Sequence, residues 1–103
     1  MSASDFYTVL TSTGLPVAYG YFNAPQDLPY LVYMGDGQTQ FAADDTQHWK
    51  NDQYQVEYYY TKKDPAVEEA IEKTLLDNGL RYDKSEDVYI SDERVFMIYY
   101  YVN

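Results

Sequence analysis

Few side chains in this sequence could perform nucleophilic chemistry. Cysteine is absent, and His48 is the only histidine of the 103 residues. A serine nucleophile needs a base held beside it, and no nucleophile-elbow pattern places one there. We therefore predict no catalytic site of this kind. Any such site would require an arbitrary choice among serines that are scattered along the chain: Ser2, Ser4, Ser12, Ser85 and Ser91.

The acidic side chains offer a second kind of chemistry, because two carboxylates held across a cleft can hydrolyse a glycosidic bond. Their positions favour solvated surface instead. Glu68, Glu69 and Glu72 are assigned to the polar side of a predicted helix, and the remaining acids cluster in predicted turns: Asp83, Glu86, Asp87, Asp92 and Glu93. The segment 35–37 also lacks the lysine and the helix start of a phosphate-binding loop. We expect no enzyme activity and no cofactor.

A polar segment, residues 38–52, contains the only tryptophan, Trp49, next to His48. Asp44 and Asp45 could join His48 in a weak cation site, but no recognised ligand spacing is present, so we predict no metal site. The segment is interpreted as a loop, with partial strand or turn as the alternative. Because long loops in small domains tend to be functional, we predict a contact arm here.

Composition limits the classes of protein to which the chain can belong. Its length fits a single domain, residues 1–103, and 46% hydrophobic residues are enough for one core. The absence of cysteine suits a reducing compartment, and neither a signal peptide nor a membrane span is predicted, so we expect a cytoplasmic origin. Seventeen acids against seven bases give a net charge of −10, which disfavours direct nucleic-acid binding. That charge serves solubility, or forms a surface past which DNA moves without sticking.

Fourteen tyrosines include two unbroken triplets, residues 58–60 and 99–101. Successive strand side chains point to opposite faces, so each triplet places rings on both faces of a sheet. Tyr58 and Tyr60 share a face with Val56 and are expected to pack under a helix, which leaves Tyr59 on the other face. Which side of the second triplet points inward stays open. The outward rings either stabilise the sheet through cross-strand pairs or form a contact surface.

The pattern of apolar residues predicts an α+β fold. It has a mainly antiparallel sheet of four to five strands, one well-defined helix on one face and a short N-terminal helix that can cover part of the rest. Helices are expected at 4–13, capped by Ser4, and at 65–78, between the cap Asp64 and Gly79. Strands are expected at 17–22, 28–34, 54–61, 80–83, 88–90 and 94–102.

Four stretches of this chain resemble small tail proteins encoded by prophages of Gram-positive bacteria. They are TGLPVAYGYF (13–22), LPYLVYMGDG (28–37), FAADDTQHWKNDQYQVEYYYTKKDP (41–65) and RVFMIYYYV (94–102). Together they are similar to the tail terminator, or tail-completion, proteins of long-tailed bacteriophages. The resemblance covers nearly the whole chain. It rests on the order of the elements and on the residue composition of the stretches, and it includes no catalytic signature.

The resemblance implies a subunit that assembles into a ring, possibly of six copies, on the tail tube and joins the tail to the head connector. Its partners would be other copies of the chain, the tube protein and a head-completion protein, in a virion tail assembled in the host cytoplasm. DNA would pass through the ring without specific binding, and no membrane is involved. Another connector or minor tail component, or an unrelated tyrosine-rich binding module, stays open. The interface candidates are His48, Trp49, Asp44, Asp45, Tyr59 and Tyr100.

Overall fold

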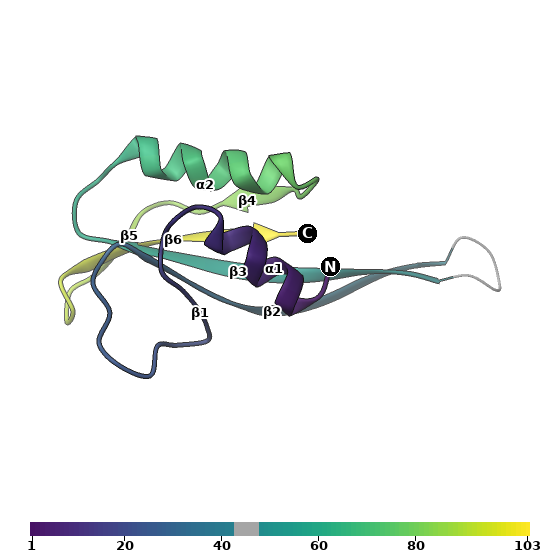
Figure 1. The fold of residues 1–103 in the computed structure, drawn as a ribbon, viewed down its shortest axis with the longest axis horizontal. Helices are drawn as coiled ribbons and strands as arrows, with labels where there is room; N and C mark the ends of the chain where they lie inside the picture. The colour runs from purple at the N-terminus through teal and green to yellow at the C-terminus, as the bar shows by residue number, and fades with distance from the viewer. Residues whose placement is uncertain (43–47) are drawn as a thin grey trace.

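The computed structural model describes residues 1–42 and 48–103, with side chains described for 1–37 and 52–103. Within these residues the chain forms two helices and a six-stranded sheet, which confirms the predicted α+β class (Figure 1). The strand order is β1-β2-β3-β6-β4, with β5 also paired to β6; β1 and β2 are parallel and the other pairs antiparallel. The elements are α1 (Ala3–Thr11), β1 (Val17–Tyr19), β2 (Tyr30–Ala42), β3 (His48–Tyr60), α2 (Pro65–Asp77), β4 (Tyr82–Lys84), β5 (Val88–Ile90) and β6 (Val95–Val102).

Local sequence signals account for both ends of α2. The Asp64 side chain caps its N-terminus and accepts a hydrogen bond from the backbone N–H of Ala66 at 3.1 Å. After its C-terminus, Gly79 adopts a φ of 75°, a conformation that glycine reaches without strain. The N–H of Leu80 then donates to the carbonyl of Leu75 at 3.0 Å, as in a Schellman motif. The predicted boundaries of this helix are confirmed.

Helix α1 lies where the sequence predicts it but begins earlier, because Ser2 is the N-cap and not Ser4. The Ser2 hydroxyl accepts a hydrogen bond from the backbone N–H of Asp5 at 3.1 Å. Its buried side chains share one face of the helix: Phe6, Val9 and Leu10. Neither α1 nor α2, the helices of the described residues, is long and apolar enough to cross a membrane.

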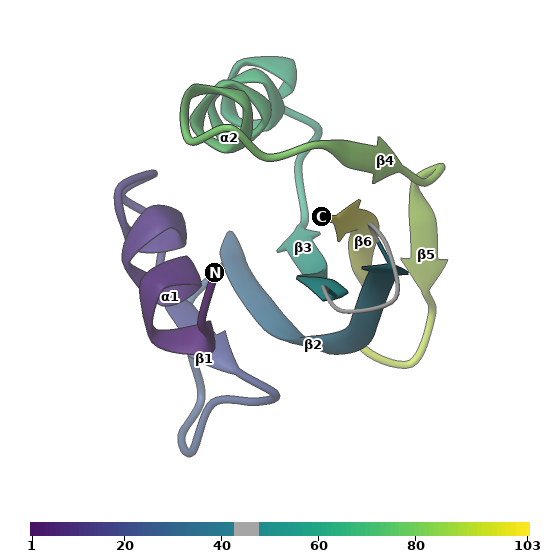
Figure 2. The same ribbon diagram turned by 90° about the vertical axis from the view of Figure 1, so that its right-hand side faces the viewer.

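Both helices pack against one face of the sheet and share a single core (Figure 2). Helix α1 therefore does not extend the cover to the second face. Alternate residues of the central strands point into this core, and the predicted inward set of β3, Val56, Tyr58 and Tyr60, is confirmed. The core residues are Phe6, Leu10, Leu31, Tyr33, Tyr54, Val56, Tyr58, Tyr60, Ile71, Leu75, Ile98, Tyr100 and Val102.

For residues 38–42 and 48–52 the loop interpretation is wrong and the alternative of partial strand is confirmed, whereas residues 43–47 lie outside the described residues. Residues 38–42 of β2 pair with residues 48–52 of β3, from Gln38 opposite Asp52 to Ala42 opposite His48. The pairing register shifts between Gly35 and Gln38. We call residues 38–42 and 48–52 the arm. It projects beyond the helices in Figure 1.

The arm continues past the part of the sheet where other strands support the hairpin. Pairing of β3 with β6 extends only to Tyr54, and pairing of β2 with β1 only to Tyr33. In the described residues the arm is therefore a two-stranded ribbon. Such a ribbon is marginally stable in water without a third strand or a packed face.

Candidate protein interface

The face of the sheet opposite the helices displays a regular array of side chains, which we call the outer face. Residues directly opposite one another in antiparallel strands lie on the same face, so β2, β3 and β6 contribute one residue each to every row. The three rows are Tyr30, Tyr59 and Met97; Val32, Glu57 and Tyr99; and Met34, Gln55 and Tyr101. Tyrosine thus occupies four of these nine positions.

On the outer face the aliphatic side chains are more deeply buried than the tyrosine rings beside them. Val32 and Met97 are each only 5% exposed, whereas Tyr30, Tyr59 and Tyr99 are half-buried and Tyr101 is 43% exposed. A half-buried tyrosine keeps its ring against apolar neighbours and its hydroxyl within reach of a partner. The outer face therefore has the mixed apolar and polar character of protein contact surfaces.

One carboxylate lies at the centre of this array. Glu57 accepts a hydrogen bond from the Tyr59 hydroxyl at 2.6 Å and another from the Gln55 amide at 3.2 Å. Burial and the hydrogen bond to the Glu57 carboxylate raise the pKa of Tyr59 well above its ordinary value. The Tyr59 hydroxyl therefore stays protonated and keeps donating at neutral pH.

A groove with a volume of about 470 Å³ lies between the outer face and the loop that follows β1. Three neighbouring rings line it: the Phe22 and Tyr30 centroids are 5.0 Å apart, and those of Tyr30 and Tyr59 are 5.1 Å apart. Tyr21 and Pro25 contribute apolar surface from the loop, and Glu93 adds a carboxylate. Burial, followed by the charges of Glu93 and Glu57, raises the pKa of Tyr30.

The structure separates the two tyrosines that the sequence offered as interface residues. Tyr59 lies on the outer face, as predicted. The choice of Tyr100 is wrong, because its ring is fully buried and its hydroxyl donates to Glu72 at 2.8 Å. Tyr99 and Tyr101 take the outward positions, and their rings stack at 5.9 Å. Alternation alone could not distinguish the two sets, because β6 is apolar at almost every position.

Two of the remaining interface candidates belong to the arm, and two lie outside the described residues. His48 and Trp49 lie at the start of β3, where the backbone pairs with Ala42 and Phe41. Asp44 and Asp45 lie outside the described residues. The predicted contacts of all four side chains stay predictions.

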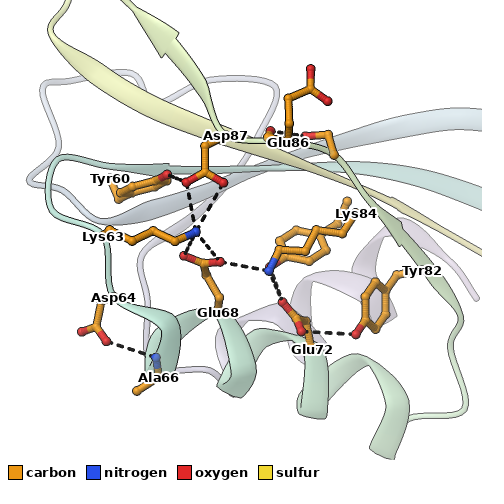
Figure 3. Close-up of polar contacts among 12 residues, drawn as sticks. Tyr60, Lys63, Asp64, Ala66, Glu68, Glu72, Tyr82, Lys84, Glu86 and Asp87 are labelled. Carbon is orange, nitrogen blue, oxygen red and sulfur yellow. Dashed lines mark hydrogen bonds and ion pairs between the residues drawn. The ribbon is translucent and has the colours of Figure 1, made fainter.

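A network of charges and hydroxyls joins α2 to the sheet, and the sequence did not reveal it (Figure 3). The expectation that Glu68 is a solvated acid is wrong, because this residue is only 2% exposed. Lys63 Nζ lies 2.8 Å from one of its oxygens, and Lys84 Nζ lies 2.9 Å from the other. Lys84 also contacts Glu72 at 2.9 Å, so this second expected surface acid is part of the network too.

Tyrosine hydroxyls complete the hydrogen bonding of the other carboxylates. The Tyr60 hydroxyl donates to Asp87, which also contacts Lys63 at 3.0 Å. The hydroxyls of Tyr100 and Tyr82 donate to Glu72 at 2.8 and 3.3 Å. Asp87 and Glu72 are therefore each held by one lysine and by at least one tyrosine hydroxyl, an arrangement that suits attachment of α2 to the sheet.

The ionisation of the network follows from these contacts. Hydrogen bonds from Tyr60 and Lys63 lower the pKa of Asp87 below its usual value. Burial raises the pKa of Glu72, but hydrogen bonds from Lys84 and Tyr100 outweigh it and lower that pKa overall. Among the described residues, no group of three or more His, Cys, Asp or Glu side chains is arranged to hold a metal ion.

The spacing of residues along α2 could have shown that Glu68 lies on the buried face of the helix. It lies three residues before Ile71 and seven before Leu75, so all three share one stripe of α2. A carboxylate on the buried stripe requires cationic or hydroxyl partners, which Lys63 and Lys84 supply.

Comparison of the sequence with models of known protein families and with curated proteins found no match.

Proposed function

We propose that this protein is a structural subunit of a phage tail, a terminator or completion protein that forms a ring on the tail tube and joins the tail to the head. One observation supports this proposal most directly. The outer face carries four tyrosines in three rows, while both helices pack on the opposite face. Aromatic surface of this kind commonly marks association with another protein.

The geometry of a ring also explains why two different surfaces would be needed. A ring closes through heterologous contacts, in which one patch of a subunit meets a different patch of the next. The outer face offers one patch, and the arm offers a second that projects from the body of the subunit (Figure 1). Docking of the arm on a neighbour would supply the packing that a two-stranded ribbon lacks by itself.

The acidic charge fits the same function. With a net charge of −10, the chain repels a phosphate backbone. A ring lined by such a surface lets DNA pass without adhering to it. The charge and the aromatic surface thus have separate roles in the proposal.

The experiment is size-exclusion chromatography with light scattering at several concentrations, with and without tube protein. We expect a ring or a ring–tube complex. Tyr101→Ser, on the outer face, should weaken assembly, and replacement of residues 38–52 by an Asn-Gly turn should abolish it. Tyr89→Ser is the matched control, because Tyr89 is 54% exposed and pairs with Phe96 on the helix-covered side. A protein that stays monomeric even with tube protein present would refute the proposal.

A further inference from the structure

We propose that the groove beside the outer face binds an arginine side chain on an extended segment of a partner protein other than a second copy of this chain. The groove combines a row of adjacent aromatic rings, in edge-to-face and tilted contact, with one carboxylate in its lining and a second bonded to one of its tyrosines. The groove shares Tyr30, Val32 and Tyr59 with the outer face, but binding does not require a ring because a single subunit contains the whole groove.

The rings of the groove provide surface suited to a planar cation. Phe22, Tyr30 and Tyr59 form a continuous row with centroids about 5 Å apart, and Tyr21 stands beside it with 73% of its surface exposed. A guanidinium stacks on aromatic faces and is attracted by their negative quadrupole. The groove volume of about 470 Å³ also lies within the range of roughly 300–1,000 Å³ typical of ligand pockets.

The charge of the groove selects a cation over an anion. Glu93 lines the groove, and Glu57 lies beside Tyr59 on the outer face and accepts a hydrogen bond from its hydroxyl. The described residues that line the groove include no lysine or arginine. A carboxylate binds a guanidinium through two parallel hydrogen bonds, so arginine matches both the rings and the acid.

The composition of the chain indicates that this arginine comes from a different protein. The chain has only two arginines, Arg81 and Arg94, and Arg94 directly follows Glu93 of the groove lining. Three of its lysines already contact acids of the same chain: Lys63, Lys73 and Lys84. A basic segment of another protein is therefore the complementary occupant.

The test uses a short blocked peptide of alternating glycine and arginine and the same peptide with citrulline, the neutral isostere, in place of arginine. Binding is measured by calorimetry and by NMR at about 0.15 M salt, where screening over about 8 Å suppresses non-specific attraction. We expect saturable binding of the arginine peptide and at least about tenfold weaker binding of the citrulline peptide, because the charge-dependent contacts are lost.

Two pairs of variants locate the binding site. Tyr21→Ala and Glu93→Gln should each weaken binding about fivefold or more, because they remove a ring and a carboxylate from the groove. Tyr89→Ala and Glu69→Gln make the same chemical changes at exposed positions that do not line the groove, and should leave the affinity within about twofold.

Three results would each overturn the proposal: no saturable binding of the arginine peptide, equal binding of the citrulline peptide, or equal losses in the groove and control variants. Binding is scored per chain and does not require a ring. A protein that binds the peptide but stays monomeric even with tube protein present would refute ring assembly and support the groove, whereas a protein that assembles with tube protein but does not bind the peptide as a free subunit would do the reverse.

Discussion

Glu68 provides the sharpest test of the network that attaches α2 to the sheet. In Glu68→Gln the side chain keeps its size but presents one oxygen and one amide NH₂ group. With its oxygen in the place of Oε1, its NH₂ group would then face Lys63, which in the native protein lies 2.8 Å from Oε2 and 2.9 Å from the Oε1 that Lys84 also contacts. Lys84 would keep a hydrogen bond to a neutral acceptor in place of a charged one.

The expected loss can be worked out from these two contacts. Hydrogen bonds to charged groups contribute about 1.5–3 kcal/mol and neutral ones about 0.5–1.5 kcal/mol. Losing one contact and weakening the other amounts to about 2.5–4.5 kcal/mol. The lysine side chains are 47% and 33% exposed and keep Asp87 and Glu72 as partners, so hydration recovers part of this. We expect a destabilisation of about 2–3 kcal/mol, below the ~3–5 kcal/mol for breaking a fully buried pair.

Urea unfolding followed by circular dichroism measures this loss. With a slope of about 1.5 kcal/mol per M, the midpoint should fall by about 1.5 M. Glu69→Gln is the matched control, because Glu69 is the exposed neighbour on the same helix and its change should cost less than about 0.5 kcal/mol. A double-mutant cycle with Lys84→Met isolates the pair energy. Equal midpoints for the two Gln variants, or a coupling energy near zero, would show that the network contributes nothing to stability.

Three further predictions concern pH and backbone conformation. The pKa values of Asp87 and Glu72 are lowered in the folded state, so both carboxylates stabilise the protein fully above their unfolded-state pKa values near 4. This stabilisation is lost as the pH falls through their folded-state pKa values. Urea unfolding between pH 7 and pH 3 should show the loss, and the decline should be smaller in Asp87→Asn. Burial raises the pKa of Tyr58 to about 12, so the protonated Tyr58 hydroxyl stabilises the fold fully below pH 10 and this contribution is lost as the pH rises through 12. The ionisation of Tyr58 should appear as a late step in an absorbance titration at about 295 nm, and this step should be missing in Tyr58→Phe. Gly79→Ala should cost about 1–2 kcal/mol, measurable as a lower urea midpoint, because alanine is strained at a φ of 75° even though nothing lies within 4 Å of its new methyl group.

The sequence was most informative where neighbouring residues decide the structure. The cap at Asp64 and the glycine at position 79 predicted both ends of α2, since a helix terminus is satisfied by groups within a few residues. The alternation along β3 predicted that Tyr58 and Tyr60 point inward and Tyr59 outward, because strand side chains alternate strictly.

Only the tertiary structure decided which rings of the second triplet face outward and which acids are buried. In β6 nearly every residue is apolar, so its register against β3 was needed to bury Tyr100 and to place Tyr99 and Tyr101 on the outer face. Glu68 looked like surface because its partners, Lys63 and Lys84, lie up to 16 residues away in sequence. Local periodicity thus determined the elements and their inward faces. The outer face, its groove and the charged network arise from contacts between strands and helices that no single segment contains.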